Sequence, residues 1–261
     1  MWEFIELETT TPVAVLRLDK PPINALDETA LHELTKAVDQ VEANPAMKVV
    51  IITSAIKDVF CAGGDLTYWP RLYAGQAGVI SEAGQHTFER LERLTKPSIA
   101  AIGGHVIGDG LSLALACDMR LASQEATFHL PEVSYGFIPG WGTIGRLVEA
   151  VGMTHAADLL LVGEWIGATR AHAIGLVSRI TAPADLTGLA ESLAARIATQ
   201  PPMAVRFAKA ALRGGSTSRS ADRTAWEASC FAAVWGSPEW EHGLQRLFNI
   251  PTVTEQEESY E

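Results

Sequence analysis

Residues 96–123 read KPSIAAIGGHVIGDGLSLALACDMRLAS, and this stretch decides the fold. The apolar run Ser98–Gly103 predicts a strand buried on both faces, because it lacks the polar alternation of a half-exposed strand. A glycine-rich turn follows, then an apolar helix over Leu111–Ala116 and a short strand over Asp118–Ala122. Buried strands that alternate with helices in this way indicate a layered α/β core.

The flanking segments continue the alternation up to about residue 130. Asp27 is placed to cap a helix, and apolar spacing predicts a second helix over Val79–Leu94. Further strands are expected over four segments: Trp2–Glu8, Val13–Asp19, Lys48–Ser54 and Ala126–Leu130. From about Thr143 onward the pattern is almost wholly helical. We therefore expect an α/β core over residues 1–195 and a helical C-terminal region over residues 196–261 that is not an independent domain.

Composition narrows the classes of function. The chain has 261 residues, 48% of them hydrophobic, and a formal net charge of −11. An acidic surface repels phosphate groups, so neither nucleic acid nor an anionic membrane is an expected partner. The chain start lacks a signal-peptide pattern, and no apolar run is long enough for a membrane span. Three widely spaced cysteines and seven scattered histidines predict a cytoplasmic protein with no metal site.

Two glycine-bearing turns and one glutamate are the candidates for chemistry. The turns are CAGGD (residues 61–65) and GGHVIGDG (residues 103–110), and each follows a buried strand. Converging backbone N–H groups from two such turns can bind the negative charge that develops on a carbonyl oxygen. Glu132 lies among apolar neighbours, which makes a buried carboxylate with a raised pKa plausible. An exposed loop glutamate is the alternative interpretation.

Ser112 suggests an alternative class, the serine hydrolases. Residues Gly110–Ala114 (GLSLA) resemble the elbow that carries a nucleophilic serine. The elbow places its serine at a sharp turn between strand and helix, whereas Ser112 falls inside the expected helix. A small polar helix residue is the better interpretation.

Taken together, the chain resembles the crotonase superfamily, the enoyl-CoA hydratase/isomerase family, from about Trp2 to Phe248. The segments that carry the resemblance include LDKPPINAL, FCAGGDL, FHLPEVSYGFIPGWGTIGRL and AIGLVS, besides residues 96–123. The resemblance implies a crotonase-type spiral of ββα units with a helical C-terminal trimerisation region. It also implies an acyl-CoA substrate, a homotrimer or dimer of trimers, and no cofactor beyond the coenzyme A of the substrate.

The resemblance also assigns roles to residues of the site. The N–H groups of Gly64 and Asp109 would form the oxyanion hole, and Glu132 would be the proton shuttle. Residues expected to contact coenzyme A lie in two segments: Pro22, Ile23 and Ala25 in the first, and Ala62, Asp65 and Leu66 in the second. The acyl chain would meet the bulky segment Thr67–Gly84, which contains Tyr68, Trp69 and Tyr73.

Two departures from the family pattern bear on the reaction. Ser112 stands where hydratases of the family carry a second glutamate, and Asp109 stands where members usually carry glycine. A single glutamate suffices to move a double bond from C3 to C2, so the sequence favours an isomerase. A hydratase or other enolate chemistry that uses Asp109, or a water held by Ser112, is the alternative. The carboxylate of Asp109 could otherwise be turned aside. A catalytically retired acyl-CoA-binding protein is the third hypothesis.

Overall fold

The computed structural model describes residues 2–69 and 77–214, together with Trp226, residues 228–233 and 237–239, and His242. The chain divides into two compact units, Met1–Ala198 and Thr199–Glu261. Unit 1 contains both β-sheets and the predicted site residues. Unit 2 contains α7 (Pro202–Gly214). Tyr73 and most of residues 215–261 lie outside the described residues.

In the described part of unit 1, ten strands form two sheets. The larger sheet has the order β1-β2-β3-β5-β7-β10, and the smaller has the order β4-β6-β8-β9. The strands are β1 (Ile5–Thr10), β2 (Val13–Leu18), β3 (Val49–Ser54), β4 (Val59–Cys61), β5 (Ser98–Ile102), β6 (His105–Ile107), β7 (Met119–Ser123), β8 (Thr127–His129), β9 (Ile166–Gly167) and β10 (Arg179–Thr181). Within each sheet all neighbours are parallel except β1 with β2 and β8 with β9.

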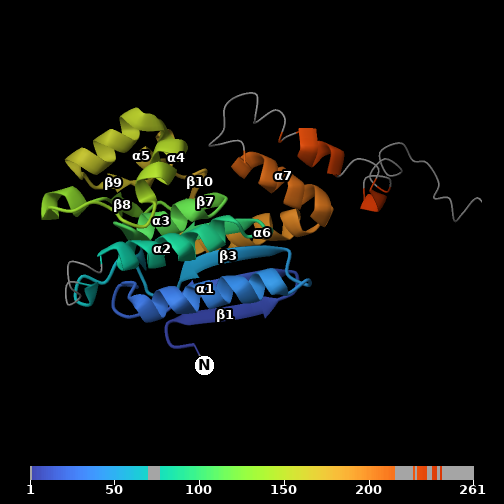
Figure 1. Cartoon of the computed structure of the whole chain (residues 1–261), viewed down its shortest axis with the longest axis horizontal. Coiled ribbons are helices and arrows are strands. Elements are labelled where there is room, and N and C mark those ends of the chain that lie inside the picture. The colour runs from blue at the N-terminus through green and yellow to red at the C-terminus, as the bar shows by residue number, and fades with distance from the viewer. Residues whose placement is uncertain are drawn as a thin grey trace, which may run out of the picture. The chain divides into compact units, whose positions relative to one another are not determined.

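Successive turns of the chain add one strand to each sheet. β3 and β4, then β5 and β6, then β7 and β8 divide in this way between the larger and the smaller sheet. The helices of unit 1 are α1 (Glu28–Ala43), α2 (Ala77–Glu92), α3 (Gly110–Ala116), α4 (Thr143–Ala157), α5 (Ala168–Ala173) and α6 (Leu186–Ala198). Figure 1 shows α1, α2 and α3 packed in succession, one helix per turn. The predicted spiral of ββα units is confirmed.

Both faces of the larger sheet are covered. Along β3, Val50 and Ile52 pack in the core that includes α1, α2 and α3, whereas Val49 and Ile51 face the opposite way and pack against α6. A strand whose side chains are buried on both faces appears in the sequence as a continuous apolar run. This explains why KVVIITS and SIAAI lack polar alternation. The predicted Asp27 cap is also confirmed, because its Oδ1 accepts a hydrogen bond from the Ala30 N–H at 2.9 Å.

Residues 143–214 are mainly helical, as expected, but two short strands interrupt the helices. β9 and β10 lie in that region and add an edge strand to each sheet. The stretch GGHVIGDG, read as a turn, contains β6, and β4 precedes CAGGD. These strands have only two or three residues, too few to show a period of two. Their existence depends on pairing with neighbours distant in sequence.

The structure also describes the cysteines and the length of the helices. None of the three cysteines forms a disulfide bond, and all three are buried. Among the helices of the described part of the chain, none is long and apolar enough to cross a membrane.

Candidate active site

The two glycine-bearing turns meet at the ends of β4 and β6. A β-carbon on Gly63 would lie 2.8 Å from the carbonyl oxygen of Ile107 and 2.9 Å from the nitrogen of Asp109. The two backbones therefore touch where only a hydrogen atom fits between them. The N–H groups of Gly64 and Asp109 donate to no protein acceptor within residues 2–69 and 77–214. Two free donors on adjoining turns are what an oxyanion hole requires.

Glu132 faces these turns with a buried carboxylate. It begins the short 3₁₀ helix η3 (Glu132–Tyr135), and only 4% of its surface is exposed. Its Oε2 has no hydrogen-bond partner among the described residues, and its Oε1 lies 2.5 Å from the position of a β-carbon on Gly108. Burial, together with a smaller contribution from the negative charge of Asp109, raises the pKa of Glu132 to about 7. Of the two interpretations of this glutamate, the buried one is confirmed. A carboxyl group with this pKa can both accept and donate a proton near neutral pH.

The side chain of Asp109 turns toward the loop that precedes α4. Its Oδ1 accepts hydrogen bonds from the hydroxyl of Thr143 at 2.6 Å and the N–H of Trp141 at 3.3 Å. Its Oδ2 accepts from the N–H of Gly140 at 3.4 Å. Burial raises the pKa of this carboxyl group, although the three hydrogen bonds oppose the shift. The carboxylate is thus turned aside and holds residues 140–143, while the backbone N–H of Asp109 has no acceptor among the described residues.

Ser112 is enclosed and hydrogen-bonded within the protein. It lies in α3 with no exposed surface, which excludes the nucleophile-elbow interpretation. Its hydroxyl donates to the carbonyl oxygen of Trp141 at 2.8 Å and accepts from Nη1 of Arg146 at 3.3 Å. Arg146 also pairs with Glu92 at 2.9 Å. The position at which hydratases of the resembled family carry a second glutamate is therefore occupied by a hydroxyl group and a guanidinium group.

The two segments expected to contact coenzyme A lie side by side. The N–H of Ala62 donates to the carbonyl oxygen of Ile23 at 3.1 Å, and the N–H of Asp65 donates to that of Leu26 at 3.0 Å. Leu26 and Gly64 form an isolated parallel bridge. Pro22, Ile23 and Leu66 are exposed, whereas Ala25, Ala62 and Asp65 are half-buried. The paired segments thus expose apolar side chains next to Gly64.

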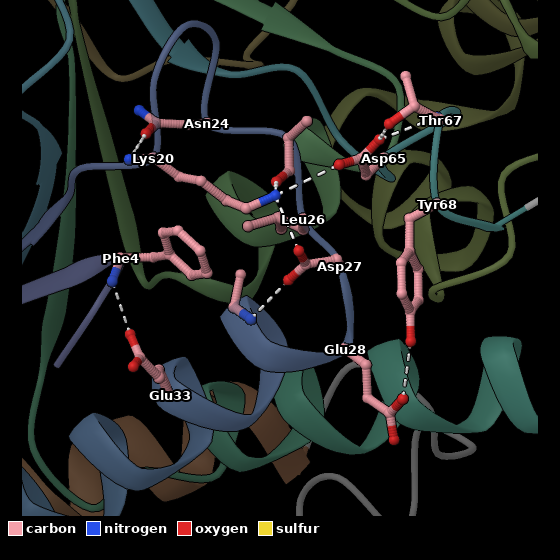
Figure 2. A network of polar contacts seen from close by, with 12 residues as sticks. Phe4, Lys20, Asn24, Leu26, Asp27, Glu28, Glu33, Asp65, Thr67 and Tyr68 are labelled. Atoms are coloured by element: carbon pink, nitrogen blue, oxygen red, sulfur yellow. Dashed lines mark hydrogen bonds and ion pairs between the residues drawn. The ribbon is translucent and has the colours of Figure 1, made fainter.

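Lys20 joins these two segments (Figure 2). Its ammonium group contacts the carbonyl oxygen of Ala25 at 2.8 Å, Asp27 at 3.0 Å and Asp65 at 3.3 Å. Burial raises the pKa of Asp65, but hydrogen bonds from Thr67 and the charge of Lys20 outweigh it and hold the pKa below its usual value. The side chain of Asp65 is therefore engaged within the protein, and Lys20 helps to fix the turn that carries Gly64.

Replacing Lys20 with methionine should lower the free energy of unfolding by about 2–3 kcal/mol at pH 7. The change leaves Asp27 and Asp65 without their shared cation in a half-buried site. Urea titrations at several pH values measure the effect. Because the folded-state pKa of Asp65 is lowered, the stability gained from this pairing is present above its unfolded pKa and is lost as the pH falls through its folded pKa. The difference between the proteins should therefore shrink below about pH 4.

Lys57→Met is the matched control, because the Lys57 side chain is 91% exposed. It should leave the urea midpoint unchanged. An equal loss of stability in both variants would contradict the role assigned to Lys20.

Sequence reasoning missed Lys20, Trp141 and Arg146. All three lie within the segments that carry the family resemblance. A cation in an acidic chain and a tryptophan between two glycines were the available signals. Neither indicates a partner without the tertiary structure.

Comparison with known proteins addresses the family of the chain. The family model described as enoyl-CoA hydratase/isomerase matches residues 8–249. A crotonyl-CoA hydratase of Syntrophomonas wolfei is 35% identical over 93% of this chain and 94% of its own length. A short-chain-enoyl-CoA hydratase of Clostridium acetobutylicum is 33% identical over 89% of this chain and 90% of its own.

Solved structures extend the agreement to the fold. The crystal structure of an enoyl-CoA hydratase from Bacillus anthracis superposes with a TM-score of 0.91 and 31% identity, over 95% of this chain and 96% of that one. The family model, the relatives above 30% identity and this structure each cover nearly the whole chain. All three point to the same family. The chain belongs to the enoyl-CoA hydratase/isomerase family, within the crotonase superfamily.

Proposed function

We propose that this chain acts on an acyl-CoA thioester whose carbonyl oxygen accepts hydrogen bonds from the N–H groups of Gly64 and Asp109. Glu132 exchanges a proton with carbon 2 while the negative charge rests on that oxygen. The observation that supports this most is the unpaired, buried carboxylate oxygen of Glu132 beside two turns with free N–H groups. Such donors lower the barrier by stabilising charge that develops only in the transition state.

Hydration of a 2-enoyl thioester is the first candidate reaction. The sequence favours isomerisation, but the names of the relatives favour hydration. Glu132 takes a proton from water as the water oxygen bonds to C3, and the electron pair of the double bond moves to C2. The protonated Glu132 then delivers that proton to C2. With a pKa of about 7, this one carboxyl group can fill both roles.

Isomerisation is the second candidate, and the surroundings of Ser112 favour it. The hydroxyl there is bonded to Trp141 and Arg146, so α3 supplies no second carboxylate to activate water. In this reaction Glu132 removes a proton from C2 of a 3-enoyl thioester and returns it at C4. The double bond moves from C3 to C2, and no water is consumed.

Reaction in deuterated water separates the candidates. Crotonyl-CoA and a 3-enoyl-CoA are incubated with the wild type and with Asp109→Asn, and the products are followed by mass spectrometry. A hydroxyacyl product from crotonyl-CoA establishes hydration, and its loss in Asp109→Asn would make Asp109 the second carboxyl group. A 2-enoyl product from the 3-enoyl substrate, without hydroxyacyl product, establishes isomerisation.

The third hypothesis, a retired acyl-CoA-binding protein, predicts a different result. Thioester binding would persist with no deuterium incorporated at C2 from either substrate. That outcome would contradict the proposed function. Incorporation of deuterium at C2 that depends on Glu132 would instead exclude the hypothesis of a retired protein.

The remaining proposals follow from family membership. Pro22, Ile23, Ala25, Ala62, Asp65 and Leu66 would contact coenzyme A, Asp65 through its backbone because its side chain is engaged. No cofactor beyond the substrate's own coenzyme A is proposed. We place the protein in the cytoplasm as a homotrimer or a dimer of trimers, and sedimentation of a single-chain mass would contradict that assembly.

A further inference from the structure

Trp141 lies along both halves of the oxyanion hole. Its backbone N–H donates to the carboxylate of Asp109 at 3.3 Å, which fixes one end of the residue beside the second donor. At the other end, Cη2 of the indole ring lies 3.4 Å from the position of a β-carbon on Gly64. The residue therefore spans from one donor turn to the other, and its ring forms a wall of the site beside Gly64.

The indole ring is buried and packed against two aromatic side chains. Only 2% of Trp141 is exposed, and its Nε1–H donates to the carbonyl oxygen of Ile80 at 3.0 Å. Phe88 and Trp69 meet the ring edge-on, with centroids 5.8 and 6.1 Å away. Trp69 is itself fixed by a hydrogen bond from Nε1 to the carbonyl oxygen of Leu26 at 2.9 Å. The hydrogen bond to Ile80 and the two aromatic neighbours hold the ring in place.

Gly84 shows that the fold is built around this ring. A β-carbon on Gly84 would lie 2.1 Å from Cγ of Trp141, an overlap with a rigid ring. Glycine in a helix interior weakens the helix relative to alanine, so its presence in the middle of α2 needs a reason. The close approach of Trp141 supplies that reason.

We propose that Trp141 limits the length of the acyl chain, so that the site takes short-chain acyl-CoA thioesters. The proposal rests on the proposed function, which places the thioester oxygen at Gly64 and Asp109 and carbon 2 at Glu132. The carbons beyond that point run along the wall that Trp141 forms. A short chain ends before the ring. A long chain meets the ring and the residues that hold it.

Chain-length preference in Trp141 variants tests the proposal. Trp141→Ala and Trp141→Leu are compared with the wild type on crotonyl-CoA and 2-octenoyl-CoA. Each methylene group that becomes buried is worth about fourfold in binding. The ratio of kcat/KM for octenoyl to that for crotonyl should therefore rise at least about tenfold in both variants. The leucine variant still fills part of the core, so it reports on the ring if the alanine variant fails to fold.

Trp165→Ala is the matched control. The Trp165 side chain is 52% exposed and stacks on His129, outside the wall. This variant should keep the wild-type ratio of the two substrates.

Binding without turnover separates this proposal from the proposed function. Calorimetric titration with butyryl-CoA and octanoyl-CoA needs no reaction at C2. The wild type should bind butyryl-CoA more tightly, and the preference should reverse or vanish in Trp141→Leu. That result with no turnover would overturn the proposed function and leave the role of Trp141 standing. Equal binding of both thioesters by the wild type, or an unchanged preference in a folded variant, would overturn the role of Trp141.

Discussion

Replacing Glu132 with glutamine should lower kcat/KM by at least about a hundredfold, the contribution expected of a general acid–base. Glutamine keeps the size of the side chain but can neither accept nor deliver the proton at C2. The oxyanion hole remains, so thioester binding should persist within a few-fold. Steady-state kinetics on the substrate identified in deuterated water, together with calorimetric binding, measure both quantities.

Glu125→Gln is the control for this substitution. Glu125 is exposed and lies before β8, so the same change of charge should leave the rate unaltered. Retention of full activity in Glu132→Gln would remove Glu132 from the mechanism, and equal losses in both variants would point to a global effect.

The raised pKa of Glu132 has consequences for both activity and stability. If the carboxylate form abstracts the proton, kcat/KM should rise with pH and level off above about 7. The folded state holds a proton that the unfolded chain releases between pH 4.5 and about 7, so stability falls as the pH rises through that window. Glu132→Gln removes this cost. At pH 8 it should therefore be more stable than the wild type, by at most about 3 kcal/mol.

The second large effect is expected for Gly108→Ala, which should reduce kcat by about ten- to a hundredfold. The new β-carbon would lie 2.5 Å from Oε1 of Glu132, so the carboxylate must move. A displacement of about 1 Å at a catalytic group can cost a hundredfold in rate. Gly108 also has a φ of +53°, so alanine adds backbone strain of about 1–3 kcal/mol.

Gly175→Ala separates the two consequences. Gly175 has a φ of +82°, and the nearest atom to a β-carbon there is the carbonyl oxygen of Ala150, at an ordinary 3.5 Å. This variant should lose stability but keep its rate. If the rates of the two variants were equal after correction for the folded fraction, contact with Glu132 would not be the cause.

Much of the fold could be predicted from the sequence because its signals are local. Buried parallel strands such as β3 and β5 are recognisable as uninterrupted apolar runs, and Asp27 marks the beginning of α1. β9 and β10 could not be found in this way. A strand of two or three residues has no measurable period, and it exists only because a partner strand offers hydrogen bonds. The helical prediction for that region therefore left out these two strands.

The sequence by itself determined the family, the ββα spiral and the identity of the proton-exchanging candidate, because these depend on residue types in a fixed order. Only the tertiary structure decided how those residues are arranged. In the structure, Oε2 of Glu132 is buried without a hydrogen-bond partner, and the side chain of Asp109 turns toward Thr143. Ser112 is hydrogen-bonded to Arg146, and the ring of Trp141 lies against Gly64. The physical reason is that burial, hydrogen bonding and close packing join atoms from segments far apart in the chain. A linear pattern names the groups present, but it does not give the distances that set their pKa values and their space.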